Sequence, residues 1–267
     1  MKKLIAIMMI LGIVSALIAV DSSPKCSGKP EDKTIIQAVK WYRDSAEQKA
    51  LYREIYAIAT RYIEDKVKSD NLKPDTWGVS IDIDETALDN SWYFKNCTEV
   101  ADDENDFSEF VVKPELSKAL PGVIDFTKKV HELGGYVSMV SNRDGSYKYE
   151  SGGVLDSTVS NLKKEGIYFD QVVLANRKDS KTPSDKNPRF KSIESGEYDA
   201  AQMVWSNKLP AHKLIVWCGD NIQDFPVFKQ KNLIGVEGSS DKFDHFSNGY
   251  FIFPNPMYGS WEANEYK

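Results

Sequence analysis

The chain has 267 residues, of which 41% are hydrophobic and 28% are charged, a composition typical of a globular protein with one sizeable domain or one domain carrying an insertion. Its formal net charge of −6 and its isoelectric point near 5.3 exclude the broad basic surface that binding to a nucleic acid polymer requires. An acidic chain that bound a phosphorylated ligand would therefore need a local lysine or a metal ion.

Residues 1–20 differ in kind from the rest of the chain. Lys2 and Lys3 precede a long apolar run that ends in small residues, a pattern typical of a secretory signal peptide. The run is also long enough to span a bilayer, so an uncleaved anchor is the alternative. The small residues favour cleavage, and we expect residues 1–20 to be removed.

Three cysteines, Cys26, Cys97 and Cys218, are too few for a disulfide framework. One bridge, for example Cys26 to Cys97, is compatible with them, and Cys218 in "LIVWCGD" is predicted to be a buried free thiol. Bacterial lipoproteins are acylated on a cysteine just after the signal, but "SSPK" precedes Cys26, and its lysine does not fit a lipid-attachment sequence. The sequence therefore predicts an exported protein, periplasmic or secreted, without a stable membrane anchor.

The first predicted element after the signal is helical, from about residue 31 to 69, with at most one interruption. Leu51, Ile55, Ile58 and Tyr62 recur at helical spacing with charged residues between them, which predicts an apolar face. The stretch "NLKPDTWG" then ends the helix.

Apolar runs of strand length alternate with amphipathic helices in the rest of the chain. We expect strands at 77–83, 135–140, 171–175, 213–218, 232–236 and 249–253, and helices near 122–133, 153–165, 188–197 and 223–230. This alternation predicts an α/β fold with a parallel sheet covered by helices on both faces. The aromatic and acidic segment 87–120 fits neither pattern and is expected to be an insertion, which forms a smaller helical cap with residues 31–70. Residues 21–267 are predicted to be a single domain.

Polar residues follow several of the predicted strands, and the carboxyl ends of parallel strands meet at one edge of a sheet, where ligands bind. After the first strand, Asp82, Asp84 and Glu85 stand almost side by side although like charges repel; a capped helix start is the alternative reading of these three. The further candidates are Ser141, Asn142 and Arg143 in "SNRD", Asp220 and Asp224 in "GDNIQDF", and Lys181 and Lys186 in "SKTPSDKNPR".

Carboxylates from two strands that meet at one edge need a cation. Aspartates without histidine or cysteine suit one divalent ion, Mg²⁺, because hard cations prefer oxygen ligands. With a hydroxyl group and a lysine nearby, this set describes a phosphoryl-transfer site. Asp82 would attack phosphorus, and Asp84 would protonate the leaving oxygen and then deprotonate the hydrolytic water.

Four stretches, "DIDET", "SNR", "SDKNPR" and "GDNIQD", resemble the four motifs of the haloacid dehalogenase (HAD) superfamily of phosphatases, in order and in suitable strand contexts. More narrowly, "AVKWYRDSAEQKALYREIY", "DIDETALDNS", "SDKNPRFKSIE" and "NPMYGSWE" resemble the class C acid phosphatases. These are exported bacterial enzymes, several of them lipoproteins with nucleotidase activity. The resemblance covers about residues 36–262, and it implies a HAD-like, Rossmann-type sheet with a small helical cap.

The resemblance also implies a role for each aspartate. Asp82 would be the nucleophile and a metal ligand. Asp84 would be the acid/base and would give the metal its backbone carbonyl, and Asp220 would complete the protein ligands. Asp224 would support that shell.

For the substrate, the resemblance implies that Ser141 and Asn142 hold the phosphoryl group and that Lys186 neutralises it, with Lys181 the weaker candidate for that lysine. Phe110 and Tyr258 match an aromatic pair that surrounds the base of the substrate in similar enzymes. Phe107 and Trp261 are expected to pack in the core instead.

The function expected is an exported, metal-dependent acid phosphatase that hydrolyses small phosphomonoesters, such as nucleoside 5'-monophosphates, through an aspartyl-phosphate. One alternative is a phosphotransferase with the same intermediate. The other is a non-catalytic binding or storage protein on the same fold, which loss of the nucleophile would mark, and Asp82 is present. The expected partner is a small-molecule phosphomonoester, and a homodimer stays open.

Overall fold

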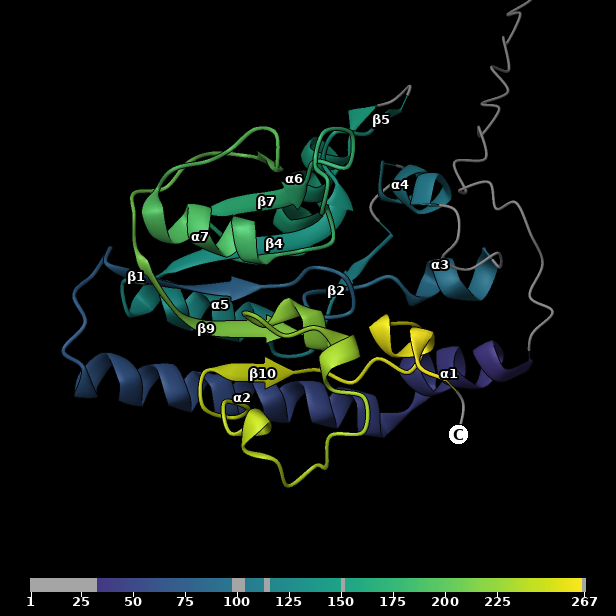
Figure 1. Ribbon diagram of the computed structural model, residues 1–267, viewed down its shortest axis with the longest axis horizontal. Coiled ribbons are helices and arrows are strands. Elements are labelled where there is room, and N and C mark those ends of the chain that lie inside the picture. The colour runs from purple at the N-terminus through teal and green to yellow at the C-terminus, as the bar shows by residue number, and fades with distance from the viewer. Residues whose placement is uncertain (1–32, 98–103, 113–115, 150–151, 266–267) are drawn as a thin grey trace, which may run out of the picture.

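A six-stranded sheet lies at the centre of the computed structural model, in the order β10-β9-β1-β4-β7-β8 (Figure 1). The model describes residues 33–97, 104–112, 116–149 and 152–265, so the predicted signal peptide and Cys26 lie outside the described residues. The strands are β1 (Trp77–Ile81), β4 (Tyr136–Asp144), β7 (Gln171–Ala175), β8 (Met203–Trp205), β9 (Lys213–Gly219) and β10 (Tyr250–Ile252).

Five of these strands run parallel, and β8 lies antiparallel to β7 at one edge. Every residue of β1 and β7 is buried, as expected for strands with helices on both faces. The predicted α/β fold is therefore confirmed, while the edge strand β8 was not predicted. Its three residues are too few to show a period.

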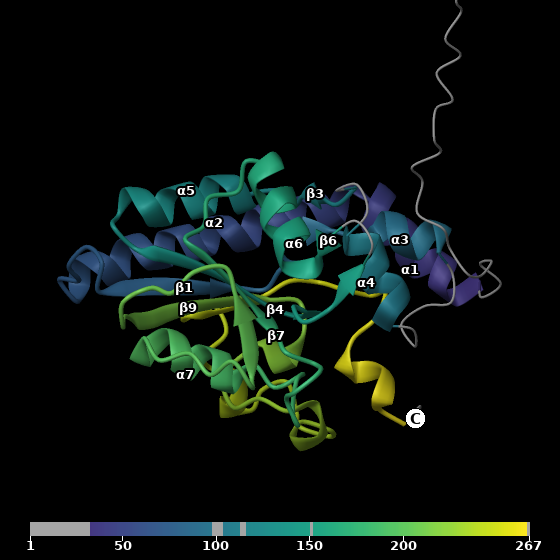
Figure 2. The same cartoon turned by 90° about the horizontal axis from the view of Figure 1, so that it is seen from above.

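Three helices cover one face of the sheet, α2 (Ala46–Ser69), α5 (Val123–Glu132) and α6 (Val154–Lys164), and α7 (Asn187–Ser195) covers the other (Figure 2). The predicted long helix is confirmed as α1 (Lys33–Asp44) and α2, separated by Ser45, whose side chain caps α2. The buried face of α2 lies one residue beyond the predicted one: Tyr52, Tyr56, Ala59 and Ile63 are buried, whereas Leu51 is exposed. Ile55, Ile58 and Tyr62 of the predicted face still pack, partly buried, against the core, but the most deeply buried positions include tyrosines whose hydroxyl groups find partners inside.

The insertion lies over the carboxyl ends of the strands (Figure 1). It contains α3 (Ser91–Asn96), α4 (Glu104–Val112) and a short antiparallel pair, β2 (Leu88–Asp89) with β3 (Lys118–Ala119). Helix α1 packs against α3, and α4 packs against α6. Of the N-terminal segment expected in the cap, α1 therefore lies with the insertion, whereas α2 packs along the sheet.

Two predicted elements between β9 and β10 are wrong. The helix expected at 223–230 is only a 3₁₀ turn, η1 (Ile222–Asp224), and the strand expected at 232–236 is replaced by η2 (Gln230–Asn232) and turns. Pro226 cannot continue a helix, and Val227 adopts a left-handed backbone with φ of 62°. The edge place beside β9 is taken by β10, so the run that contains Ile234 has no strand partner and this side chain is 55% exposed.

The remaining elements are short: β5 (Lys148–Tyr149) with β6 (Gly152–Gly153), η3 (Asp241–Phe243) and η4 (Ser260–Ala263). Cys97 is disulfide-bonded and Cys218 is a buried free thiol, as predicted for the latter.

No helix in the described part of the chain is both long and apolar enough to cross a membrane.

Candidate active site

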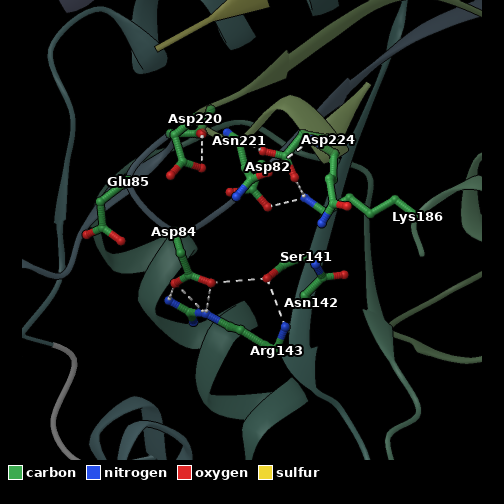
Figure 3. Close-up of polar contacts among 12 residues, drawn as sticks. Asp82, Asp84, Glu85, Ser141, Asn142, Arg143, Lys186, Asp220, Asn221 and Asp224 are labelled. Atoms are coloured by element: carbon green, nitrogen blue, oxygen red, sulfur yellow. Dashed lines mark hydrogen bonds and ion pairs between the residues drawn. The ribbon is translucent and has the colours of Figure 1, made fainter. Parts of the chain in front are cut away.

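The site lies where the strand order changes direction. Strand β1 lies between β4 and β9. From β1 the chain continues to β4, β7 and β8 on one side of the sheet, and it then returns to β9 and β10 on the other side. In open α/β sheets this arrangement leaves a crevice at the carboxyl ends of the strands. Asp82 and Asp84 follow β1, Ser141 lies near the end of β4, and Asp220 follows β9, so the predicted residues meet there (Figure 3).

Three aspartates form a compact cluster at this edge. One oxygen each of Asp82, Asp220 and Asp224 lies within 4.8 Å of the others. Gly219 makes the packing feasible, because a Cβ there would lie 2.3 Å from the Cβ of Asp224. Burial raises the pKa of Asp82 to about 7. The Lys186 ammonium lowers this pKa, whereas the charges of Asp224 and Asp84 raise it further. Burial, and then the charges of Asp224 and Asp82, also raise the pKa of Asp220 well above its usual range.

Lys186 is the lysine of the cluster, as predicted. Its side chain is 2% exposed, and its Nζ contacts Asp82 Oδ1 and lies 2.7 Å from Asp224 Oδ1. Burial lowers the pKa of this lysine, but the charges of Asp224 and Asp82 outweigh burial and raise it, so Lys186 stays protonated. Lys181 is exposed on the loop before α7 and lies outside the cluster.

Asp84 turns away from the other aspartates, toward Arg143 and Ser141 (Figure 3). The Arg143 guanidinium donates to Asp84 from Nε and Nη2, and the hydroxyl group of Ser141 and the amide of Asn90 donate as well. The bidentate arginine holds this carboxylate in one orientation. Arg143 was predicted only as a strand-end residue without a role, and no feature of the sequence pointed to Asn90.

The end of β4 carries two extra residues relative to its neighbour. Ser141 pairs with Leu174 and Asp144 with Ala175, so Asn142 and Arg143 lie in a bulge. Bulges of this kind redirect side chains next to active sites. Asn142 Oδ1 accepts a hydrogen bond from buried Arg189, a residue without predicted role. Because a guanidinium only donates, the amide nitrogen of Asn142 faces the other way.

A strained turn follows Asp84. Glu85 has a left-handed backbone with φ of 54° and is fully buried. Tyr52 of α2 donates to the carbonyl of Glu85, and Tyr56 of α2 donates to the carbonyl of Thr86 at 2.9 Å. The carboxylate of Glu85 accepts from the hydroxyl group of Tyr258, so this turn connects three segments that are distant in sequence.

The cluster forms the floor of a cavity of about 260 Å³ with an apolar wall. Tyr258 lines it, as expected, and stacks on Phe94 with ring centroids 4.7 Å apart. Phe110 does not reach the cavity: it is 3% exposed and packs against Trp92, Tyr93 and Phe107. The wall consists of Tyr93, Phe94, Phe107, Val111, Val154 and Tyr258.

The two aromatic residues expected to pack in the core lie in different surroundings. Phe107 packs against the core, as expected, and also lines the cavity. Trp261, also expected in the core, is 46% exposed on η4. Phe107 and Val111 of α4 line the cavity, whereas Phe110, beside Phe107 on the same helix, is covered by Trp92 and Tyr93; no pattern in this short helix distinguishes these positions.

Comparison with known families decides what this arrangement belongs to. Residues 27–261 match the family model of "HAD superfamily, subfamily IIIB (Acid phosphatase)". The chain belongs to this subfamily of acid phosphatases.

Solved structures of acid phosphatases are also similar to this chain. One of them is the class C acid phosphatase from Bacillus anthracis, which is 25% identical in sequence. The match covers 85% of this chain and 86% of that chain, with a TM-score of 0.64. A second structure of the Bacillus anthracis enzyme, with tungstate bound, matches at 24% identity with the same TM-score and coverage, which supports the fold.

The aspartates of this acid phosphatase could hold a metal ion. Their donor set is three carboxylates within reach of one another, which is the chemistry of a hard cation site. Asp82 and Asp224 are largely removed from water, and Lys186 supplies one positive charge against three carboxylates. The residues therefore fit a divalent cation, which would compensate their remaining charge.

Proposed function

We propose that this acid phosphatase is exported and hydrolyses small phosphomonoesters, in particular nucleoside 5'-monophosphates, with one Mg²⁺ ion and through an aspartyl-phosphate on Asp82. The observation that carries the proposal is the position of Asp82. Its carboxylate lies at the floor of the cavity, paired with Lys186 and next to Asp220 and Asp224.

In the first step, an oxygen of Asp82 attacks phosphorus and the bond to the leaving oxygen breaks. Lys186, the hydroxyl group of Ser141 and the amide nitrogen of Asn142 would bind the phosphoryl oxygens, whose charge needs fixed donors. Mg²⁺ held by Asp82, Asp220 and the backbone carbonyl of Asp84 would supply further positive charge to these oxygens.

Asp84 would act as general acid in this step, because its carboxyl group lies in the cavity beside Ser141. It gives its proton to the leaving oxygen and becomes a carboxylate. In the second step this carboxylate takes a proton from water, the water oxygen attacks phosphorus, and the bond to Asp82 breaks to release phosphate.

The wall of the cavity favours substrates with a ring. Phe94, Phe107 and Tyr258 line the same cavity as the aspartates. Every nucleobase or phenyl ring has a π-face that can stack, so such a wall accepts many bases without selecting one. This supports nucleoside monophosphates and aryl phosphates over small polar esters.

The activity is tested by the hydrolysis of 4-nitrophenyl phosphate and nucleoside 5'-monophosphates by the mature chain, with and without a chelator. We expect turnover that the chelator abolishes and added Mg²⁺ restores. Phosphate release that a chelator does not change would contradict metal dependence, and no hydrolysis of any ester would overturn the proposal.

The role of the aromatic wall is tested by Tyr258→Ala. Loss of one stacking surface is expected to cost about 1–3 kcal/mol for a substrate with a ring, or roughly 5- to 150-fold in kcat/KM. Glycerol phosphate has no ring and should be affected much less. Tyr258→Phe, which keeps the ring but not the hydroxyl group, is the matched control and should retain the preference; an equal loss on all substrates in Tyr258→Ala would exclude stacking.

Export is tested by the intact mass of the protein recovered outside the cytoplasm. The signal-peptide pattern predicts a mature chain that begins between about residues 17 and 22. A diacylglycerol adduct on Cys26 would show instead that the protein is a lipoprotein.

A further inference from the structure

The two oxygens of Asp84 have unequal surroundings. Oδ1 accepts from Asn90 Nδ2 at 2.8 Å, from Arg143 Nε at 2.9 Å and from Arg143 Nη2 at 2.7 Å. Oδ2 has longer contacts, to the hydroxyl group of Ser141 at 3.1 Å and to Arg143 Nε at 3.2 Å. Three strong donors thus hold one oxygen, and the other is held more weakly.

The residues that hold Oδ1 are themselves held in place. Arg143 Nη1 donates to Thr158 Oγ1 of α6 at 2.9 Å, and the arginine side chain is 2% exposed. Asn90 Oδ1 accepts from the hydroxyl group of Ser117 at 2.6 Å, which sets the amide so that its nitrogen faces Asp84. The insertion and β4 therefore each supply donors to one atom of the site, and α6 supports the arginine of β4.

We propose, on the basis of the function proposed above, that Arg143 and Asn90 are positioning residues that fix Oδ1 of Asp84 and so make Oδ2 the atom that carries the catalytic proton. A proton on Oδ1 would point at three N–H donors. A proton on Oδ2 meets Ser141, whose hydroxyl group can rotate from donating to accepting. Asp84, Ser141 and Arg143 all line the cavity, and of the two oxygens Oδ2 has the longer and fewer contacts, so it is the one free to exchange a proton with a substrate there.

The proton transfer is then assigned to one atom in both steps. As Asp82 forms its bond to phosphorus, the bond from phosphorus to the leaving oxygen breaks and its electron pair stays on that oxygen. The proton moves from Oδ2 to this oxygen, which gives the alcohol and leaves Asp84 as a carboxylate paired with Arg143. Oδ2 later takes a proton from the attacking water, the water oxygen bonds to phosphorus, and the electron pair of the broken bond returns to Asp82.

A leaving-group series tests the role of Arg143, because a nitrophenolate leaves without help from an acid, whereas phenolate and alkoxide ions do not. General acid catalysis contributes about 10²–10⁴-fold. In Arg143→Gln we expect kcat/KM to fall at least about 10²-fold for phenyl phosphate and glycerol phosphate, but less than about 10-fold for 4-nitrophenyl phosphate, on the same principle.

The second step gives an independent readout. With 4-nitrophenyl phosphate, phosphorylation of Asp82 should survive in Arg143→Gln while attack by water is slowed, since the base is misplaced. A pre-steady-state burst of nitrophenolate, close to one per enzyme, is therefore expected in the variant. A merely structural role would lower the active fraction without creating a burst.

If Arg143→Gln does not fold, two milder variants test the same positioning role. Asn90→Ala removes one donor to Oδ1, and Thr158→Val removes a support of Arg143 with little change in shape. Both should show the same leaving-group dependence to a smaller extent. Arg43→Gln is the matched control, because Arg43 donates to Ser91 at the start of α3 and not to Asp84; it should affect all esters equally.

Equal losses on all three esters in folded variants, without a burst, would overturn the proposal, and a general rise in KM would assign Arg143 to the phosphoryl group instead. A wild-type enzyme without phosphatase activity would overturn the proposed function, which is a distinct result.

Discussion

Asp82 is a buried carboxylate that lies close to two other carboxylates, those of Asp220 and Asp224. A carboxylate that is buried beside two others would ordinarily be protonated or excluded from the interior. Here one ammonium group, that of Lys186, contacts both Asp82 and Asp224. The remaining negative charge suits the cluster to a cation, and in the proposed mechanism the burial of Asp82 would exclude water that competes with its attack on phosphorus.

Asp82→Asn should abolish turnover, because an amide oxygen is a poor nucleophile toward phosphorus. Steady-state hydrolysis of 4-nitrophenyl phosphate is expected to fall more than about 10³-fold, as for other covalent nucleophiles. Thermal unfolding should show a folded protein. The control is Asp89→Asn, because Asp89 accepts from the backbone N–H of Ser91 outside the cluster and asparagine keeps that acceptor. Retention of more than a few per cent of activity by folded Asp82→Asn would exclude Asp82 as the nucleophile.

Helix α2 acts on the site through its tyrosines. Tyr52 and Tyr56 are one turn apart on its buried face, and their hydroxyl groups bind the carbonyl groups of Glu85 and Thr86. A left-handed Glu85 costs conformational energy, which such contacts must offset. The helix thus holds the turn that directly follows Asp84.

Tyr56→Phe should loosen that turn, since it leaves the carbonyl group of Thr86 without this donor. We expect a loss of about 1–3 kcal/mol in the free energy of unfolding, measured by urea denaturation, together with a lower kcat well below the melting temperature. Tyr62→Phe is the matched control, because Tyr62 lies on the same helix but packs its ring on Phe251. Full activity in a destabilised Tyr56→Phe would mean that the hydroxyl group stabilises the fold only.

The molecule as a whole concentrates charge at one edge of the sheet. The insertion, the ends of β1, β4 and β9, and the C-terminal segment with Tyr258 all face one cavity. The buried carboxylates at its floor destabilise the metal-free folded state, because folding removes them from water and brings like charges together. The raised pKa of Asp220 has the same cause, since its ionised form is disfavoured in the folded protein.

Mg²⁺ should therefore stabilise the folded protein independently of any reaction. Binding at 100 times the dissociation constant contributes about 2.7 kcal/mol, or roughly 5–10 °C in Tm for a domain of this size. Thermal unfolding with a chelator, and then with excess MgCl₂, measures the shift, and KCl of equal ionic strength controls for screening.

Asp220→Asn should remove most of the Mg²⁺ shift, while Asn255 can still donate to the oxygen that asparagine retains. Equal shifts with KCl, or an undiminished shift in Asp220→Asn, would show that the aspartates do not bind the ion.

The acid phosphatase family and the grouping of the carboxylates could be predicted from the sequence, because both depend on local stretches of the chain. Asp82 and Asp84 directly follow an apolar strand, and Asp220 follows another, so knowing that the strands are parallel is enough to bring them together. Lys186 stands in a motif at the start of a helix. Strands with both faces buried are continuous apolar runs, which is why β1, β4, β7 and β9 could be located within a few residues.

Contacts between distant segments were decided only by the tertiary structure. The pairing of Asp84 with Arg143 and Asn90 depends on a bulge in β4 and on the path of the insertion, and neither has a sequence period. Phe110 is excluded from the cavity because it packs among Trp92, Tyr93 and Phe107, and β10 lies at the edge of the sheet because it pairs with β9. Local sequence sets which groups stand at a strand end, but packing across the molecule sets which way they point.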